Sequence, residues 1–181
     1  MRKRKRLRRL LFIVLLFYFI NFFVVFGSEV GSRLVDFSLE DLHEARYSQA
    51  NLEGKITLVV LQSRTTLQTA IDCKTQLKKL IPENQAVQMV AIMDLRKRPS
   101  LVPKFALKSK ILAQDTTSKE IPFLLDWDGG VTKALGGEDN KCKLLIVDPA
   151  LKVVYNQECE KAAIESEIKP LLIELSSTSL R

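Results

Sequence analysis

The chain has 181 residues, enough for one well-packed domain plus an extension and too few for two ordinary domains with separate cores. Its formal net charge is +7, from 28 basic and 21 acidic residues, but seven basic residues precede Glu29, the first acidic one. The remainder therefore carries no net charge, which argues against a nucleic-acid-binding domain, because such a domain needs a basic face. The 46% hydrophobic content excludes a disordered chain.

A basic cluster at residues 2–9 is followed by an apolar run from Leu10 to Gly27, in which Asn21 is the one strongly polar side chain. As a helix, such a run is roughly 27 Å long, close to the thickness of the hydrocarbon core of a bilayer. The basic flank predicts that the N-terminus lies in the cytoplasm and that everything after Gly27 lies outside. We expect residues 10–27 to contact the membrane.

Two fates of this segment stay open. An uncleaved anchor explains its length and its many Phe residues, whereas a signal peptide needs small residues at the cleavage site, such as Val25 and Gly27. The expected organisation is an N-terminal membrane or signal segment, a short linker, one domain and a tail, at residues 1–27, 28–33, 34–175 and 176–181.

The first half of the domain predicts a βαβ unit. After a short approach strand at 34–39 and loops, continuous apolar character at Ile56–Leu61 is typical of a strand buried on both faces. Apolar residues at spacings of three and four predict a helix over 67–80, capped by Thr65 or Thr66 and ended by Pro82. A second buried strand at 87–93 follows, so we expect the two strands to be parallel neighbours.

The second half predicts two further helices, a third strand and a hairpin. The cluster Arg96, Lys97 and Arg98 is expected to be a solvated loop, and Val102, Phe105, Ala106 and Leu112 are expected to face the core. The remaining predicted elements are a helix at 101–113, a strand at 121–125, a turn at 126–130, a short helix at 131–135, hairpin strands at 143–147 and 151–155, and a helix at 161–175, bent or restarted at Pro170.

These elements match a thioredoxin-like α/β fold, a central mixed sheet flanked by helices. The segment NLEGKITLVVLQSRTTLQT resembles the start of an AhpC, peroxiredoxin or TlpA-type domain, in which a Gly-Lys pair precedes the first buried strand and a reactive cysteine motif follows it. IPFLLDWDGGVTKALGG resembles the inserted strand and turn of that branch, and CKLLIVDPALKVVYN its hairpin. Ser63 to Thr66 are also similar to exported YtfJ-like proteins. The resemblance implies a bacterial envelope protein.

The sequence departs from that family at the catalytic motif. Aligning Gly54 and Lys55 with the family's Gly-Lys pair places Thr66 and Thr69 where the two cysteines of a CxxC motif fall, and a Thr hydroxyl cannot exchange disulfides. The cis-proline expected before the hairpin is also missing, and Cys142 lies near its position. Residues that correspond to the active-site groove are Ser63, Arg64, Thr65, Thr66, Thr69 and Lys141. Arg64 is either a solvated residue or a cation that binds an anionic ligand at the helix N-terminus.

The three cysteines allow at most one intramolecular disulfide. Cys73 lies on the core face of its helix and is expected to be a buried small hydrophobe. Across the hairpin, Cys142 faces Glu158, and a bulge or one extra loop residue brings it opposite Cys159, where a disulfide can form. Such a bond is either a structural staple or a redox pair beside the groove.

Other chemistries find little support in the sequence. A single histidine, His43, leaves no basis for a multi-histidine metal site or a Ser-His-Asp triad, and no phosphate-binding glycine motif occurs. Asp126 and Asp128 are expected to form a turn. We therefore expect a non-catalytic binding or scaffolding domain, without cofactor or metal, that contacts the membrane and an unknown envelope protein. It is either anchored in the inner membrane facing the periplasm or secreted to the periplasm. The alternative is a thiol-disulfide oxidoreductase that uses Cys142 and Cys159.

Overall fold

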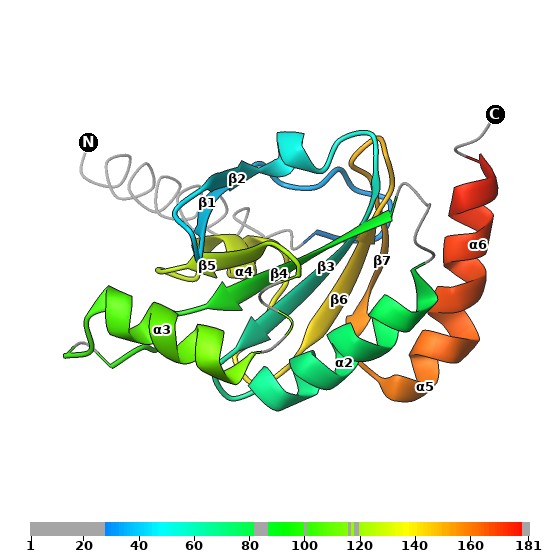
Figure 1. Cartoon of the computed structure of the whole chain (residues 1–181). Coiled ribbons are helices and arrows are strands. Elements are labelled where there is room, and N and C mark those ends of the chain that lie inside the picture. The colour runs from blue at the N-terminus through cyan, green and yellow to red at the C-terminus, as the bar shows by residue number, and fades with distance from the viewer. Residues whose placement is uncertain (1–27, 82–86, 100, 116, 118–119, 179–181) are drawn as a thin grey trace, which may run out of the picture.

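The computed structural model describes residues 28–81, 87–99, 101–115, 117 and 120–178. Within these ranges, the chain forms one mixed sheet of seven strands in the order β2-β1-β5-β4-β3-β6-β7. Helices flank the sheet, as the α/β prediction requires (Figure 1). The strands are β1 Ser38–Asp41, β2 Arg46–Ser48, β3 Ile56–Ser63, β4 Val87–Asp94, β5 Phe123–Asp126, β6 Lys143–Val147 and β7 Val153–Glu158. The main helices are α2 Leu67–Leu80, α3 Lys104–Gln114, α4 Gly130–Ala134, α5 Lys161–Ala163 and α6 Lys169–Thr178.

The predicted βαβ unit is confirmed. Every residue of β3 is buried, and β3 runs parallel to β4 over its whole length, with α2 between them in sequence. Helix α2 has the predicted bounds, and β6 pairs antiparallel with both β3 and β7. The continuous apolar segments therefore form the centre of the sheet, where both faces are covered.

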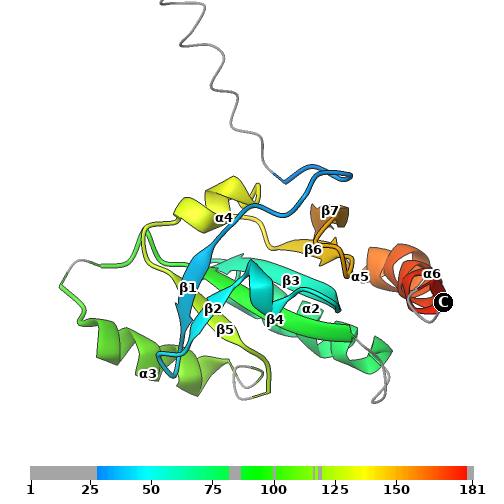
Figure 2. The ribbon, with the colours of Figure 1, turned by 90° about the horizontal axis from the view of Figure 1, so that it is seen from above.

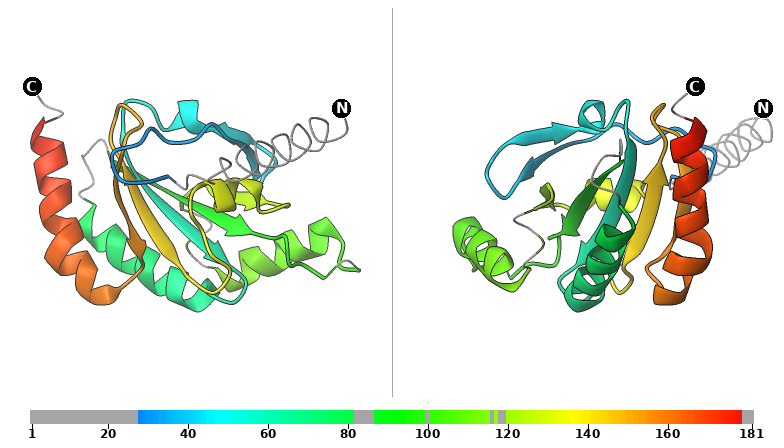
Figure 3. Two further views of the ribbon diagram at one scale, coloured as in Figure 1. Left: turned by 180° about the vertical axis from the view of Figure 1, so that it is seen from behind. Right: turned by 45° about the vertical axis from the view of Figure 1, so that its right-hand side comes forward.

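The two faces of the sheet are covered differently. Helices α2, α3 and α6 cover one face, whereas α4 and the segment that leads into β1 cover the other (Figure 2). Figure 3 shows the C-terminal helices at the β7 edge, on the same side as α2. Apolar side chains of β3 alternate between these faces: Leu58 and Val60 contact the α2 side, and Val59 and Leu61 contact the other.

The N-terminal part of the domain differs from the prediction. The approach strand begins at Ser38 rather than Leu34, and it forms a hairpin with β2, a strand the sequence did not predict. Strand β2 has three residues, too few for a periodic pattern. Leu34 and Phe37 are buried, so the apolar residues taken for a strand pack under the sheet as an extended segment.

The predicted inward face of α3 was wrong for Phe105, which is 72% exposed. The buried residues are Leu107 and Ile111, which lie one turn apart and pack against β4 and β5. Phe105 precedes Leu107 by two positions, about 200° around the helix, so it lies on the opposite side. The helix begins after Pro103, whose fixed φ suits its N-cap position.

The C-terminal helix is irregular one turn before Pro170. Residues Ile164–Ile168 (η3) form a π-helical turn between α5 and α6. Proline cannot donate to the carbonyl four residues before it, and its ring crowds that carbonyl, which explains the widened turn. The predicted irregularity of this helix therefore lies just before Pro170, and regular α-helix begins again at Lys169.

Among the residues described, no helix is long and apolar enough to cross a bilayer. The predicted membrane segment at 1–27 and the predicted helix end at Pro82 lie outside those residues.

Candidate functional site

The groove begins where β3 ends and α2 starts. Thr66 is the N-cap of α2, but its hydroxyl does not cap the helix; it accepts a hydrogen bond of 2.9 Å from the backbone N–H of Ser63. Both residues are buried. This bond fixes the turn between strand and helix, so Thr66 has a structural role at the position where the family alignment places a cysteine.

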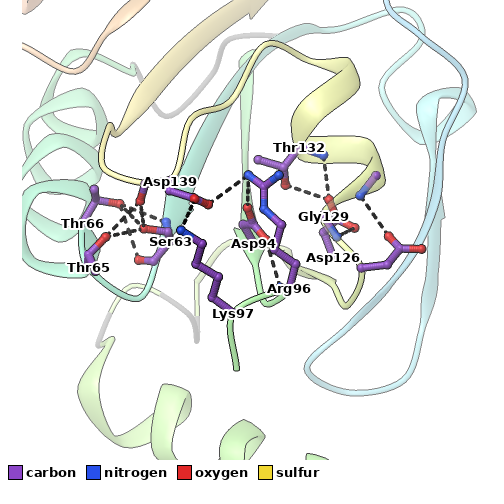
Figure 4. Close-up of polar contacts among 12 residues, drawn as sticks. Ser63, Thr65, Thr66, Asp94, Arg96, Lys97, Asp126, Gly129, Thr132 and Asp139 are labelled. Carbon is purple, nitrogen blue, oxygen red and sulfur yellow. Dashed lines mark hydrogen bonds and ion pairs between the residues drawn. The ribbon is translucent and has the colours of Figure 1, made fainter. Parts of the chain in front are cut away.

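A loop from the far side of the sheet closes against this turn. The hydroxyls of Ser63 and Thr65 both donate to the carbonyl oxygen of Asp139, at 2.6 and 2.9 Å (Figure 4). Asp139 lies three residues before Cys142, in the segment that enters β6. The turn after β3 and the loop before β6 are therefore held together by short-chain hydroxyls.

Charged residues after β4 complete the groove. Arg96 pairs with Asp94 at 2.7 Å and with Asp139 at 3.0 Å, and Lys97 pairs with the other oxygen of Asp139 (Figure 4). The hydrogen bond from Lys97, followed by the charge of Arg96, lowers the pKa of Asp139. Arg96 lies in an exposed turn after β4, as expected, but its side chain is held in place by two carboxylates.

Arg98, the third member of that basic cluster, also has a defined contact. Its guanidinium lies 5.2 Å from the ring centre of Trp127 and donates to the Trp127 carbonyl oxygen at 3.0 Å. Lys104 covers the same ring at 4.7 Å. The basic cluster thus joins the end of β4 to the turn after β5.

An open cavity of about 310 Å³ lies at the groove. The structure places three of the six predicted groove residues in its wall. It adds four residues that the sequence did not assign to the groove, because they lie at the end of β4, just after it, or just before β6. Its lining residues are Ser63, Arg64, Thr65, Asp94, Lys97, Asp139 and Asn140.

The other three predicted groove residues lie outside that wall. Thr66 is buried beneath it, and Thr69 is exposed one turn farther along α2. Lys141 pairs with Glu158 at 2.6 Å and with Glu138 at 3.6 Å. The hydrogen bond from Lys141 to Glu158, followed by the charge of Glu138, raises the pKa of Lys141.

Asp126 and Asp128 form a turn, as predicted. The carboxylate of Asp126 accepts hydrogen bonds from the backbone of Gly129 at 3.1 Å and from the backbone and hydroxyl of Thr132 at 2.6 and 2.7 Å (Figure 4). Asp128 accepts from Gly130 at 2.9 Å. Burial raises the pKa of Asp126, while the hydrogen bond from Gly130 lowers that of Asp128.

The hairpin has the bulge that brings Cys142 opposite Cys159. Val147 pairs with Val153 and Ile146 with Tyr155, so the register shifts by one residue between these pairs. Beyond them the backbone N–H of Cys159 donates to the carbonyl of Cys142 at 2.8 Å, and the two sulfurs are 3.0 Å apart. Both cysteines are free thiols in the structure.

Cys73 is buried, as predicted, and belongs to the same core cluster as Cys142. Interaction with the thiol of Cys142, together with burial, raises the pKa of Cys73 to about 12. Interaction with the thiol of Cys159, followed by that of Cys73, lowers the pKa of Cys142 to about 5, whereas interaction with Cys142 raises the pKa of Cys159. Among the described residues, no group of three or more His, Cys, Asp or Glu could hold a metal ion.

A buried ion pair lies beside this cysteine cluster. Lys74 and Asp115 are almost fully buried, and the Lys74 ammonium also lies 5.0 Å from the ring centre of Phe123. Burial lowers the pKa of Lys74, and its contact with Asp115 acts in the opposite direction. The pair joins α2 to the residue that follows α3.

Comparison with known proteins gives the fold. No family model matches the chain, and no curated protein matches it. A candidate protein disulfide isomerase from Bacteroides thetaiotaomicron is similar to it at 15% identity, with a TM-score of 0.64 over 82% of this chain and 91% of that one. The thioredoxin domain of a thiol-disulfide oxidoreductase from Bacteroides vulgatus is 14% identical, with a TM-score of 0.61 over 82% of this chain and 98% of that one. The exposed lipoprotein thioredoxin of Streptococcus pneumoniae is 18% identical, with a TM-score of 0.55 over 75% of this chain and 99% of that one.

The chain has a thioredoxin-like fold. At these identities the likeness concerns the fold alone, and the chemistry has to be argued from the site. The sequence located the start of the groove but missed Asp94, Lys97 and Asp139. Their signal was their position after the buried strand at 87–93 and before the hairpin, since loops at one end of a sheet lie close together.

Proposed function

We propose that this chain is a non-catalytic binding domain of the cell envelope, tethered to the membrane through residues 10–27. The observation that carries the proposal is the groove cavity of about 310 Å³. It occupies the region where the family alignment places catalytic cysteines, and its wall holds hydroxyls, carboxylates and cations but no thiol. The groove therefore offers hydrogen bonds and charge to a partner rather than disulfide exchange.

The lining favours a polar segment of an envelope protein. Asp139 already binds Arg96 and Lys97, so its charge is compensated, whereas Arg64 is exposed and makes no hydrogen bond or ion pair with another described residue. Arg64 also lies two residues before the N-cap of α2, near the end of the helix where its dipole favours a negative charge. We expect the partner to present a carboxylate to Arg64.

Site-directed photo-crosslinking in cells tests this proposal. A photo-reactive amino acid at Asn140, in the cavity wall, should give a discrete adduct, and the same amino acid at the exposed Ser166 of η3 should not. Arg64→Glu should reduce the Asn140 adduct about tenfold, equivalent to about 1.4 kcal/mol of binding free energy. An adduct of equal yield at both positions, or one indifferent to Arg64→Glu, contradicts binding at the groove.

Thiol-disulfide exchange through Cys142 and Cys159 is a second candidate function. The observation that favours it is the direct opposition of the two cysteines, with sulfurs 3.0 Å apart and Cys159 partly exposed. Residues paired across an antiparallel ladder have Cα atoms about 4.5 to 5.5 Å apart, inside the range that a disulfide needs.

The reduction potential separates the two candidates. Equilibration with glutathione buffers, followed by alkylation and mass spectrometry, measures it. A Cys142–Cys159 bond that titrates between roughly −120 and −270 mV supports exchange, because oxidoreductases lie in that range. A bond below about −300 mV is a structural staple and leaves the binding function alone.

A further inference from the structure

The first described residues of the domain are hydrogen-bonded to the edge of the sheet. The backbone N–H of Gly31 donates to the carbonyl oxygen of Val153 at 2.8 Å, and the N–H of Val153 donates to the carbonyl oxygen of Ser32 at 2.9 Å. These two bonds form a short antiparallel ladder on the outer edge of β7. Residues 28–33, which the sequence suggests as a linker, are therefore held on the domain.

The attachment begins at Ser28, directly after the predicted membrane segment. Ser28 is 2% exposed, and its carbonyl oxygen accepts a hydrogen bond of 2.6 Å from the side-chain amide of Asn156 on β7. The apolar run that we expect to enter the membrane ends at Gly27. Because one residue spans at most about 3.6 Å, a bilayer that holds residues 10–27 brings its headgroups to the surface around Ser28.

A closed turn projects an apolar side chain from this attachment. The backbone N–H of Ser32 donates to the carbonyl oxygen of Glu29 at 3.0 Å, and the Ser32 hydroxyl donates to the same oxygen at 2.7 Å. Gly31 has a φ of 95° in this turn, a conformation that favours glycine. Val30, which precedes it, is 61% exposed. The turn therefore presents Val30 to the surroundings close to the expected end of the membrane segment.

Two cations lie beside the turn. Arg33 and Lys152 pair across an antiparallel bridge, and both are exposed. Neither side chain makes a hydrogen bond or an ion pair within the part of the chain that the structure describes, and Glu29, the acidic residue of the segment 28–34, pairs with neither. Like charges directly opposite each other on neighbouring strands are unfavourable, so an anion that binds both cations stabilises this edge.

We propose that Val30, Arg33 and Lys152 form a membrane-docking surface, in which the two cations bind the headgroups of anionic phospholipids. The proposal rests on the membrane tether of the proposed function, because only an uncleaved segment holds the bilayer at this surface. A lipid headgroup is favoured over an acidic protein because the chain itself brings the bilayer to these cations, and basic residues next to a membrane segment are attracted to an anionic leaflet.

Docking determines which side of the domain faces away from the bilayer. Figure 2 shows the dark-blue segment that begins at Ser28 passing α4 and β7 at one side of the molecule, with α3 at the opposite side. Phe105 of α3 is 72% exposed, more than Val30, so apolar character alone would favour membrane contact at Phe105. The docking surface requires the reverse, because it holds Phe105 away from the bilayer.

Photo-crosslinking to lipid tests the docking surface. The full-length chain, with a photo-reactive amino acid at Val30 or at Phe105, is incorporated into nanodiscs of phosphatidylethanolamine and phosphatidylglycerol, and lipid adducts are measured by mass spectrometry. We expect at least about ten times more adduct at Val30 than at Phe105. Replacing phosphatidylglycerol with phosphatidylcholine removes the anionic headgroups and should reduce the Val30 adduct about fivefold.

Glutamine variants identify the cations that bind the headgroups. The double variant Arg33→Gln, Lys152→Gln should reduce the Val30 adduct by the same factor of about five. Its matched control is Lys79→Gln, Lys110→Gln, which makes the same change in charge at exposed positions of α2 and α3 and should have no effect. Circular dichroism verifies folding. For a variant that fails to fold, raising the salt from about 0.1 M to about 1 M on the wild type replaces it and should also reduce the Val30 adduct, because salt screens exposed charges.

The outcomes distinguish the docking surface from the tether on which it rests. If alkaline extraction removes the full-length chain from the bilayer, the tether fails and the docking surface fails with it. If the chain stays in the bilayer but Val30 gives no more adduct than Phe105, the docking surface is wrong and the tether remains. A Val30 adduct that is indifferent to lipid charge, to salt and to the loss of Arg33 and Lys152 overturns the binding of anionic headgroups.

Discussion

Cys142 differs from an ordinary cysteine in its thiol neighbours, of which Cys159 has the larger effect and Cys73 the smaller. They lower its pKa to about 5, whereas an unperturbed thiol titrates near about 8.5. We predict that the rate at which iodoacetamide alkylates Cys142 changes little between pH 6 and 8, because the thiolate is already formed there. The rate is followed peptide by peptide by mass spectrometry.

The double variant Cys73→Ser, Cys159→Ala provides the comparison. The alanine removes the thiol of Cys159 and the serine replaces that of Cys73, so the pKa of Cys142 should rise toward its ordinary value. Alkylation should then increase about tenfold for each pH unit below about 8.5. The same profile in the variant and in the wild type contradicts the assignment of the low pKa to these two neighbouring thiols.

The pKa of Tyr155 is raised for a different reason than the pKa of Cys142 is lowered. Burial, with the nearby charge of Glu167 as a second cause, raises the pKa of Tyr155 to about 12, and its hydroxyl lies 3.3 Å from that carboxylate. The folded state holds this proton more tightly than the unfolded state, so the stability that it contributes is complete below about pH 10 and is lost as the pH rises toward 12. Absorbance at the phenolate band should show one tyrosine ionising near pH 12, and Tyr155→Phe should lack it.

Thr66 shows how a residue at a presumed catalytic position can act on the fold. Thr66→Ala leaves the buried N–H of Ser63 without its acceptor, so we predict a loss of about 1–3 kcal/mol in the free energy of unfolding. Thr69→Ala on the same helix is the matched control; its side chain is exposed, and it should change stability by less than about 0.5 kcal/mol. Urea denaturation followed by circular dichroism measures both. Equal effects contradict the structural role.

At the scale of elements, the Lys74–Asp115 pair joins α2 to the end of α3. Lys74→Met leaves a buried carboxylate without its cation, and we predict a loss of about 3–5 kcal/mol. Lys78→Met, one turn along α2, removes an exposed pair with Glu120 and should cost less than about 1 kcal/mol. Thermal and urea denaturation compare the two. Adding Asp115→Leu to Lys74→Met should restore most of the loss, and no recovery contradicts this account.

The sequence predicted whether a segment is a helix or a strand where its pattern of apolar residues was long. The helix over 67–80 and the strands around residues 56–61 and 87–93 are fixed by burial on one or both faces, and their sequence shows it. Strand β2 has three residues and no pattern, and its place depends on the hairpin partner β1. The sequence placed Leu112 of α3 against the core, but it misplaced Phe105 and missed Leu107 and Ile111, because the buried face is set by where the helix starts relative to β4 and β5.

Some residues of the groove could be predicted from local sequence, and others are brought there only by the fold. Ser63 and Thr65 follow a strand that the sequence predicts, so their place at the groove could be inferred. Asp94, Lys97 and Asp139 come together only because parallel strands and the hairpin end at one edge of the sheet. The cysteine cluster depends on a one-residue bulge far from any cysteine, between Ile146 and Val147, which no local preference signals.

At the scale of the whole molecule, the exposed thiol gives a test of orientation. We predict that the domain lies outside the cytoplasm, because the basic cluster at residues 2–9 keeps the N-terminus inside. In intact cells of a Gram-negative host with a permeabilised outer membrane, a membrane-impermeant maleimide should label the partly exposed Cys159 of Cys73→Ser, Cys142→Ser. A cytoplasmic protein with an exposed cysteine should stay unlabelled until the cells are lysed.

The mass of the same labelled protein decides between anchor and signal peptide. An uncleaved anchor keeps the full 20.6 kDa and stays in the membrane fraction after alkaline extraction, since an apolar helix in a bilayer is not released by charge. Cleavage after Gly27 removes the basic cluster and the apolar run together, and it leaves a smaller protein in the soluble fraction. Labelling only after lysis contradicts export in either form, and the groove and the cysteine cluster then have to be tested against cytoplasmic partners and a reducing environment.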